Sequence, residues 1–305
     1  MQKGLNTKNV LVFGEVLFDV FSDGETVLGG APFNVAWHLQ GFGANPLFVS
    51  RVGKDARGEE VRAAMTRWGM RTDGLQEDSE HPTGIVTITT RNGQPQYQIV
   101  PEQAYDYIND ADSTTVVGRA GVRILYHGTL ALRGHSSAAL TRLRELRPNQ
   151  VFLDLNLRSP WWQPETVRAC IELADVVKCN QEEFQQIAAQ NERTSLEQAA
   201  PAFLRQYTLK ALIVTRGDSG ATLFSPHGPA LQAAAGPVPD LVDTVGAGDA
   251  FSAILLLAEI GGWSPETALT RATQFAALAC GWRGATIQDG KLYKDLLERW
   301  KREPG

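Results

Sequence analysis

The sequence contains little of what marks a membrane, secreted or disulfide-rich protein. Its longest uncharged apolar run near the C-terminus, residues 250–258, is far too short to span a bilayer. The apolar stretch after the polar N-terminal residues carries Glu15 and Asp19, which makes it a poor signal peptide. The three cysteines fit neither a paired disulfide framework nor a zinc-binding spacing. We therefore expect a cytoplasmic protein of a reducing compartment, with no membrane partner.

Strong charge and the commonest nucleotide motifs are also missing. The formal net charge is −5, and no basic run suggests a nucleic-acid surface. The chain has no GxxxxGK[ST] motif of a P-loop and no GxGxxG after its first predicted strand, and its five histidines form no HExxH motif. It has no Pro/Gly/Ser-rich linker and no internal repeat. We therefore expect one domain, residues 1–305, that does not bind nucleic acid.

Hydrophobic patterning predicts strands that alternate with helices along most of the chain. The segments that read as strands are 9–21, 45–53, 122–130, 150–156, 175–180, 210–217 and 221–225. The segments that read as helices are 31–43, 56–69, 136–147, 164–174, 195–207 and most of the chain from 247 onward. Such alternation predicts an α/β fold, with a mostly parallel sheet covered by helices on both faces.

Two segments depart from this alternation. Residues 83–100 contain two β-branched runs around Asn92-Gly93, and Asn-Gly between alternating strands is a strong hairpin signal. Residues 21–30 form an irregular piece between the first strand and the first helix. Neither fits a βαβ core, so we expect them to project from the sheet edge. The predicted result is a small β-sheet lid, formed by residues of about 16–30 and 83–105.

The segment LVDTVGAGDAF, residues 241–251, places two acids around small residues at the start of an apolar helix. The helix is predicted to begin at Ala247 or Gly248, after an extended segment that ends at Val242. The first N–H groups of a helix are unpaired and carry a partial positive charge. Because Gly246, Ala247 and Gly248 have almost no side chains, their amides can touch an anion directly.

Asp249 would then lie in the first turn of that helix, next to the bound anion. A carboxylate there repels a phosphate and cannot be its ligand. It can instead be a base that takes the proton from a hydroxyl attacking the phosphorus. The structural alternative is that Asp favours helix starts and that glycine-rich turns often precede buried helices for packing alone.

Six segments together resemble the ribokinase-like (PfkB) carbohydrate kinases, in their fructokinase branch. In the order of the family they are GEVLFD, LGGAPFNVAWHLQGFGA, DLNLRSPWW, KCNQEE, VTRGDSGA and DTVGAGDAF. Their co-occurrence in this order is far more specific than any single motif. The resemblance implies a ribokinase-like fold, with a central, mostly parallel sheet, helices on both faces and a small β-sheet lid.

The resemblance also implies roles for individual residues on the sugar side. Asp249 takes the role of catalytic base, and the amides of Gly246, Ala247 and Gly248 take that of an anion hole. The positions that match the substrate-binding residues of the family are Asp19, Gly30, Asn34 and Arg158. The chemistry agrees, because a carboxylate accepts from two vicinal hydroxyls and an Asn side chain both donates and accepts. A solvated strand-end acid and a helix-start Asn are the structural alternatives for Asp19 and Asn34.

Further matches lie on the nucleotide side. The positions that match nucleotide contacts are Asn180, Thr215 and Gly217. Glu183 matches the residue that organises Mg²⁺ through its water shell, a role that suits an ion that keeps several waters. The alternative is an ordinary helix-start Asn with a Glu in the first turn. Asp243 and the Val245 carbonyl match a monovalent-cation site, for K⁺, found in some members.

The sequence departs from the family pattern in the lid. Many fructokinases and keto-deoxygluconate kinases carry a Tyr-Arg pair after the second lid strand, whereas this chain reads QYQIVPEQAYDY, without an arginine. A sugar-acid substrate would require a cation there. The sequence therefore favours an ATP-dependent fructokinase that phosphorylates the primary hydroxyl of D-fructose. The alternatives are a kinase for ribose, a nucleoside or 2-keto-3-deoxygluconate, and a catalytically silent sugar-binding regulatory protein on the same fold.

The predicted lid also suggests a protein partner. Ile85, Val86 and Ile88 are apolar residues of its first hairpin strand. An exposed apolar strand edge can pair with another copy of the chain, so we expect a homodimer through the lid.

Overall fold

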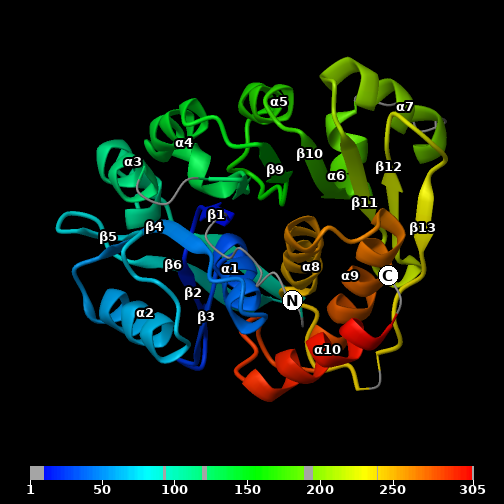
Figure 1. Cartoon of the computed structure of the whole chain (residues 1–305). Helices are drawn as coiled ribbons and strands as arrows, with labels where there is room; N and C mark the ends of the chain where they lie inside the picture. The colour runs from blue at the N-terminus through cyan, green and yellow to red at the C-terminus, as the bar shows by residue number, and fades with distance from the viewer. Residues whose placement is uncertain (1–9, 92–93, 119–121, 189–194, 239, 304–305) are drawn as a thin grey trace.

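The computed structural model describes residues 10–303, apart from 92–93, 119–121, 189–194 and 239. Its centre is a nine-stranded sheet, called the large sheet below (Figure 1). In spatial order its strands are β13 (Leu231–Ala233), β12 (Ala221–Phe224), β11 (Ala211–Thr215), β10 (Val176–Asn180), β9 (Gln150–Asp154), β8 (Ile124–His127), β1 (Val10–Phe13), β4 (Leu47–Gly53) and β5 (Leu75–Asp78). From β11 to β5 all neighbours are parallel, and β12 and β13 are antiparallel additions at one edge.

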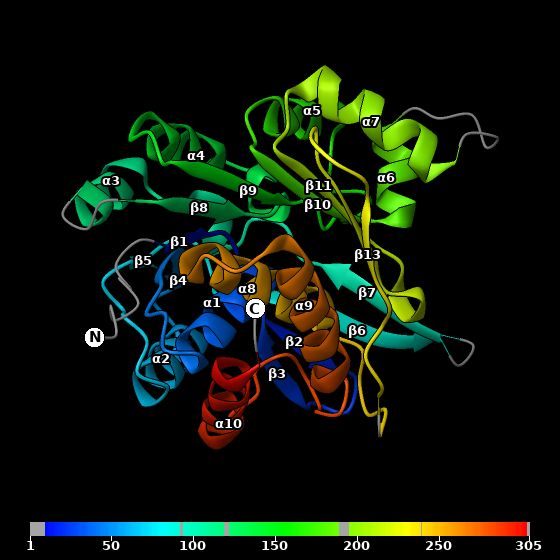
Figure 2. The same cartoon turned by 45° about the vertical axis from the view of Figure 1, so that its right-hand side comes forward.

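Helices cover both faces of the large sheet (Figure 2). On one face lie α1 (Ala31–Gly41), α2 (Ala56–Arg67), α8 (Ala247–Gly261), α9 (Pro265–Ala279) and α10 (Gly290–Arg302). On the other lie α3 (Asp110–Gly118), α4 (Ser136–Glu145), α5 (Pro164–Glu172), α6 (Gln181–Ile187) and α7 (Leu196–Tyr207). Side chains alternate along a strand, so Val10 and Val12 belong to one apolar core while Leu11 and Phe13 belong to the other. The predicted α/β fold is confirmed.

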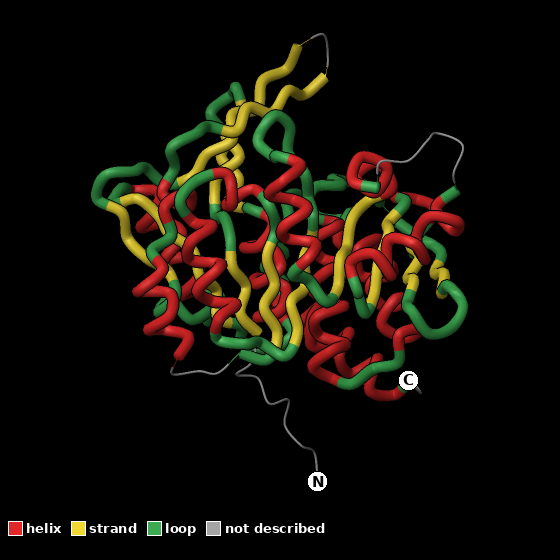
Figure 3. The backbone as a smooth tube through the Cα atoms, turned by 90° about the horizontal axis from the view of Figure 1, so that it is seen from above, coloured by secondary structure: helices red, strands yellow, loops and turns green. Residues whose placement is uncertain are grey.

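A four-stranded small sheet projects beyond one end of the large sheet (Figure 3). Its order is β3 (Thr26–Gly29), β2 (Leu17–Phe21), β6 (Gly84–Arg91) and β7 (Gln94–Ile99). These strands lie within the two segments, 16–30 and 83–105, that were predicted to form the lid. The two residues predicted to form the hairpin turn, Asn92 and Gly93, lie outside the described residues.

The prediction of one continuous strand over 9–21 was wrong. The segment breaks after Phe13, and its halves enter different sheets as β1 and β2. Gly14 has a φ of +147°, and a Cβ at this position would lie 2.5 Å from Cγ of Pro32. The chain therefore turns where a glycine permits both the backbone conformation and the close approach of α1.

The prediction that Ile85, Val86 and Ile88 form an exposed lid edge was also wrong. They lie on β6, which is a central strand of the small sheet between β2 and β7. Val86 and Ile88 are buried in an apolar cluster that also contains Tyr105 and Leu130. The alternation of the strand directs these side chains into the protein because β6 is covered on that face.

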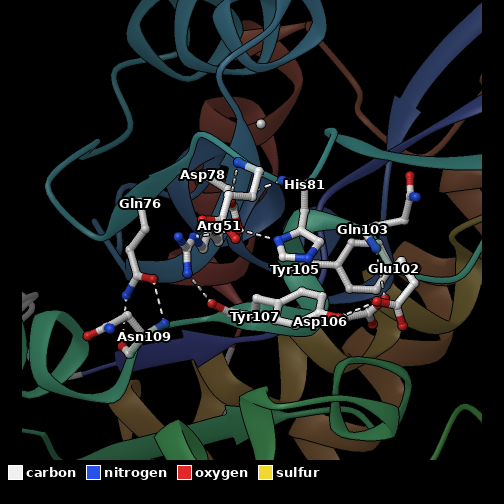
Figure 4. A network of polar contacts seen from close by, with 12 residues as sticks. Arg51, Gln76, Asp78, His81, Glu102, Gln103, Tyr105, Asp106, Tyr107 and Asn109 are labelled. Atoms are coloured by element: carbon white, nitrogen blue, oxygen red, sulfur yellow. Dashed lines mark hydrogen bonds and ion pairs between the residues drawn. The ribbon is translucent and has the colours of Figure 1, made fainter.

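Polar and aromatic contacts hold the base of the small sheet against the large sheet (Figure 4). After β7 the chain forms a 3₁₀ turn, η1 (Ala104–Tyr107). Arg51 of β4 pairs with Asp78 through Nε at 3.1 Å and donates from Nη1 to the Tyr107 carbonyl at 2.5 Å. The ring of His81 stacks on the ring of Tyr107, with centroids 3.6 Å apart. The small sheet is therefore fixed at its base.

A buried ion pair adds a second attachment. Arg133 ends another 3₁₀ turn, η2 (Leu130–Arg133), and binds Asp106 of η1 through Nε and Nη2, both at 2.8 Å. Its guanidinium also lies over the ring of Trp161, 4.6 Å from the centroid.

Among the described residues, no helix combines the length and the apolar character needed to cross a bilayer. All three cysteines are buried free thiols.

Candidate active site

A pocket of about 520 Å³ opens where the parallel strands of the large sheet end and the small sheet begins. This is the edge at which open α/β sheets bind ligands. Of the residues predicted for catalysis or binding, its lining includes Asp19, Gly30, Asn34, Arg158, Asn180, Glu183, Thr215, Gly246, Gly248 and Asp249. Gly217 lines a neighbouring hollow together with Asn180 and Thr215, and Ala247 and Asp243 lie outside the lining.

Asp249 lies in the first turn of α8, where its carboxylate is held by a residue far away in the chain. Nδ2 of Asn34, on α1, donates to its Oδ2 at 2.8 Å. Burial raises the pKa of Asp249 to about 6, while the bond from Asn34 and the charges of Lys178 and Arg158 lower it. At neutral pH the group is mostly ionised, yet it binds a proton more readily than an exposed aspartate, which suits a general base.

The turn before α8 needs glycine for reasons that differ between its two glycines. Gly246 has a φ of +80°, and a Cβ there would lie 2.2 Å from Cβ of Ala285. A Cβ on Gly248 would instead lie 3.2 Å from Nζ of Lys178, inside the pocket. The helix begins at Ala247, as predicted, and has no side-chain cap. The extended segment ending at Val242 belongs to neither sheet.

The first amides of α8 lie at a helix end where Gly246 and Gly248 line the pocket. The Ala247 N–H donates to the Thr244 carbonyl at 3.3 Å, a long bond that a bound anion would compete with. Because no side chain caps the helix, its first N–H groups are suited to an anionic ligand.

A buried polar cluster lies directly beneath this turn, and the sequence reasoning missed it. Lys178, on β10, donates from Nζ to Oδ2 of Asp154 at 2.9 Å and to the Gly248 carbonyl at 3.2 Å. Oδ2 of Asp154 also accepts from Ser252 at 2.7 Å and Tyr126 at 3.1 Å. Burial alone would lower the pKa of Lys178, but the charge and hydrogen bond of Asp154 hold it above its ordinary value. The ammonium is therefore a fixed positive charge at the start of α8.

The sugar-side residues surround the other half of the pocket. Burial and the charge of Asp243 raise the pKa of Asp19 on β2 to about 6, against the opposing charge of Arg158. Gly30 has a φ of +111°, and a Cβ there would lie 2.7 Å from the Glu15 carbonyl oxygen. Arg158 is exposed at the pocket rim. The site thus combines carboxylates with two cations, the exposed Arg158 at the rim and the buried Lys178.

Asn180 and Glu183 form a reciprocal cap of α6, which is the structural alternative considered for them. Oδ1 of Asn180 accepts from the Glu183 N–H, and Oε2 of Glu183 accepts from the Asn180 N–H, both at 2.8 Å. Oε1 of Glu183 accepts from the Leu157 N–H at 2.7 Å. The cap fixes the Glu183 carboxylate at the pocket wall.

Two observations bear on metal binding. Across the described residues, no three or more His, Cys, Asp or Glu side chains gather as a metal-ligand cluster. Single carboxylates at the pocket wall, Glu183 and Asp154, nevertheless fit Mg²⁺, which is often held by one or two carboxylates and its own waters. The Asp243 carboxylate accepts from the N–H groups of Val245 at 3.0 Å and Gly284 at 3.1 Å. Asp243 therefore orders the turn that precedes α8.

Comparison with known proteins identifies this arrangement. The model of the pfkB family carbohydrate kinases matches residues 8–290. The chain belongs to this family. A carbohydrate kinase of this family is a phosphotransferase, and the predicted enzyme class is confirmed.

Individual relatives agree with the family assignment. The kinase is 28% identical to a fructokinase of Escherichia coli, over 90% of this chain and 94% of that protein. Its fold is similar to that of a Xylella fastidiosa fructokinase with bound ATP, with a TM-score of 0.82, 21% identity and coverage of 97% and 100% of the two chains. It is also similar to a Vibrio cholerae fructokinase in a fructose-, ADP- and calcium-bound form, with a TM-score of 0.76, 24% identity and coverage of 95% and 99%. The predicted ribokinase-like fold is confirmed.

Proposed function

We propose that the kinase transfers the γ-phosphoryl group of ATP to the primary hydroxyl of D-fructose, with Asp249 as the general base. The observation that carries this proposal is the placement of the Asp249 carboxylate beside the uncapped start of α8, held by Asn34, in a pocket that also contains Asp19. A base and a group of anion-binding amides at one point suit phosphoryl transfer. Similarity to fructokinases, and nucleotide bound in the Xylella and Vibrio structures, support the choice of substrates.

Different residues of the pocket bind the sugar, take its proton and stabilise the transferring phosphoryl group. Asp19, Gly30, Asn34 and Arg158 bind the sugar, and Asp249 takes the proton of its primary hydroxyl. The oxygen then attacks the γ-phosphorus, the bond to the β–γ bridging oxygen breaks, and ADP leaves. The Gly246, Ala247 and Gly248 amides meet the negative charge on the transferring group, and Lys178 adds a fixed positive charge beneath them.

On the nucleotide side, Asn180, Thr215 and Gly217 bind ATP. Glu183 holds Mg²⁺ through water, and the ion neutralises charge on the phosphates. K⁺ is proposed to bind near Asp243 and the Val245 carbonyl. Removal of divalent cation with EDTA is expected to abolish turnover, and added Mg²⁺ is expected to restore it.

The small sheet is proposed to act as a lid that excludes water from the bound sugar and ATP. Its edge strands β3 and β7 are the segments through which a homodimer would form. Because ATP is supplied in the cytoplasm and the three buried thiols are free, we place the kinase there.

A coupled assay of ADP release across a panel of acceptors tests the function. The panel contains D-fructose, ribose, a nucleoside and 2-keto-3-deoxygluconate, with ATP and Mg²⁺ in each reaction. We expect the highest kcat/KM with D-fructose. A higher value with another acceptor would replace fructose as the substrate, and sugar binding without ADP release from any acceptor would identify a silent sugar-binding protein.

A further inference from the structure

Glu15 is a buried acid of the pocket that the proposed mechanism does not use. It lies in the short connection between β1 of the large sheet and β2 of the small sheet, and only 3% of its surface is exposed. Its side chain lines the pocket together with Asn34 and Asp249. Because its carbonyl lies against Gly30, Glu15 is fixed between the two segments expected to bind the sugar.

Glu15 and Asn34, which form one wall of the pocket, each have an acceptor atom without a partner among the described residues. Among the described residues, Oε2 of Glu15 and Oδ1 of Asn34 are buried without a hydrogen bond. The Asn34 side chain is oriented by its bond to Asp249 through Nδ2, so its oxygen is left for another donor. Buried polar atoms in native proteins are nearly always satisfied, and such atoms at a pocket wall indicate a ligand that brings hydrogen-bond donors.

The chemistry of these atoms distinguishes a sugar from a phosphate. Burial and the charge of Asp249 raise the pKa of Glu15 to about 7, against the opposing charges of Arg158 and Arg133. Near neutral pH the carboxyl is therefore present in both protonation states. A hydroxyl can donate to the ionised form of Glu15, accept from its protonated form, and donate to Oδ1 of Asn34. A phosphate oxygen only accepts, so it cannot bond Oδ1 of Asn34 or the ionised form of Glu15.

We propose that Glu15 is a further sugar-contacting residue, whose buried carboxyl hydrogen-bonds a hydroxyl of the acceptor other than the one that Asp249 deprotonates. The proposal deepens the proposed function and rests on it. It assigns to this wall a neutral, polyhydroxylated ligand, with Glu15 and Asn34 accepting from it side by side.

The test combines two changes, one that removes the hydrogen-bonding atoms of the Glu15 side chain and one that removes a single hydroxyl of the sugar. Wild type, Glu15→Met and Glu15→Gln are assayed with D-fructose and with fructose analogues that each lack one hydroxyl. Met keeps the length of the side chain but has no strong hydrogen-bonding atom, so the KM for fructose is expected to rise about 10–100-fold while the KM for ATP stays the same. Gln keeps a hydrogen-bonding end and is expected to recover most of this loss.

One analogue is expected to behave differently from the others. For the sugar that lacks the contacted hydroxyl, wild type and Glu15→Met should have nearly equal kcat/KM, because the contact is already absent. Glu60→Met, which changes an exposed acid on α2, is the matched control and should leave every constant unchanged.

Different results would overturn the Glu15 contact and the proposed kinase function. Equal relative losses for Glu15→Met with every analogue, or a loss confined to ATP, would overturn the contact and leave Glu15 a structural role. Calorimetric titration of the same proteins with the same sugars repeats the comparison without turnover, so failure of the kinase proposal is distinguished from failure of the Glu15 proposal. If another acceptor of the panel is preferred, its own deoxy analogues are used. Absence of sugar binding by the wild type would overturn both proposals.

Discussion

Individual carboxyl groups of the pocket owe their proton affinity to burial. The pKa of Asp19 and that of Asp249 are raised to about 6, and that of Glu15 to about 7. Each is opposed by nearby cations, with Arg158 acting on all three. Groups that titrate close to neutral pH are suited to exchanging protons with hydroxyls, because neither protonation state is strongly disfavoured.

The role of Asp249 is tested by the smallest change that removes its basicity. Asp249→Asn keeps the size of the side chain and is expected to lower kcat by about 10²–10⁴, the usual contribution of a positioned base. The KM values for sugar and ATP should change little. The exposed Asp23→Asn is the control. Turnover within a few-fold of wild type would remove Asp249 from the mechanism.

The raised pKa of Asp249 also predicts a pH profile. A base works only when it is ionised, so kcat/KM for fructose, which reports ionisation in the sugar-free enzyme, should fall as the pH falls through about 6. Well below that value, kcat/KM should fall about tenfold for each pH unit. Initial rates at limiting fructose and saturating ATP measure this limb, and a profile that stays flat down to the ordinary aspartate pKa of 3.8 would contradict the assignment.

At the scale of elements, the start of α8 carries two glycines on either side of Ala247, one needed for packing and the other expected to serve catalysis. Gly246→Ala requires a left-handed conformation and places Cβ against Ala285, so we expect a destabilised protein with a clearly lower Tm. Gly248→Val places its branch near Nζ of Lys178 in the pocket, and valine costs only a fraction of a kcal/mol in helix propensity. We therefore expect Gly248→Val to keep most of its Tm while kcat falls about 10²–10³-fold, as when one oxyanion donor is lost.

The two variants serve as each other's control. Tm from calorimetry and kcat at saturating sugar separate the outcomes. A Gly248→Val protein that melts far below wild type while its folded fraction keeps near-normal kcat would show that Gly248 serves packing and that the phosphate is bound elsewhere.

The sequence predicted the elements better than it predicted contacts between them. The helices at 31–43, 56–69 and 247 onward, and most strands of the parallel sheet, carry their own periodicity, so local patterning was enough. Segments with weak patterning were missed, namely β5, β13 and α3, and α6 was foreseen only at its start, as the alternative for Asn180 and Glu183. The break of 9–21 into β1 and β2 was missed because it depends on Pro32 packing against Gly14, a contact that periodicity does not contain.

The same limit explains which site residues were found. Asp249, Asn34 and Asp19 belong to motifs that can be read along the chain. Lys178 and Asp154 depend on pairing between neighbouring strands, and Ser252 reaches Asp154 from 98 residues away. The available signal was the lysine within the apolar run DVVKCN. A buried strand there would also bury this lysine, and lysine is almost never fully buried unless it is paired.

At the scale of the whole molecule, the large sheet separates two apolar cores, and each encloses a neutral histidine. His38 of α1 packs edge-on against Phe275 and hydrogen-bonds Tyr293 through Nδ1 at 2.9 Å. His127 lies at the end of β8. Burial lowers the pKa of His38 to about 3 and that of His127 to about 4. The pocket carboxyls have shifts in the opposite direction, so the two sets of groups make opposite contributions to the pH dependence of stability.

The signs follow from which state binds protons more tightly. An unfolded histidine takes up a proton near pH 6.5, whereas native His38 does so only near pH 3. Its contribution to stability is therefore present above pH 6.5 and is lost as the pH falls from there toward 3. Glu15 is the reverse: the native state holds its proton up to about pH 7 and the unfolded state only to 4.5. Its contribution is present below pH 4.5 and is lost as the pH rises through 7.

These signs give a prediction that separates the histidine from the carboxyls. When the wild type unfolds at acidic pH, His38 takes up a proton, and the His38→Leu variant has no such uptake. On acidification, the free energy of unfolding of the variant should therefore fall less than that of wild type. One proton contributes at most about 1.36 kcal/mol for each pH unit, and the unfolded histidine is already half protonated at pH 6.5, so the difference between the two free energies should shift by about 2 kcal/mol in favour of the variant between pH 6.5 and pH 4.5. Urea unfolding at both pH values measures this difference. His227→Leu changes an exposed histidine and is the matched control, expected to run parallel to wild type. If His38→Leu also runs parallel to wild type, then His38 is protonated in the native protein, and the acid sensitivity of the fold must come from other groups.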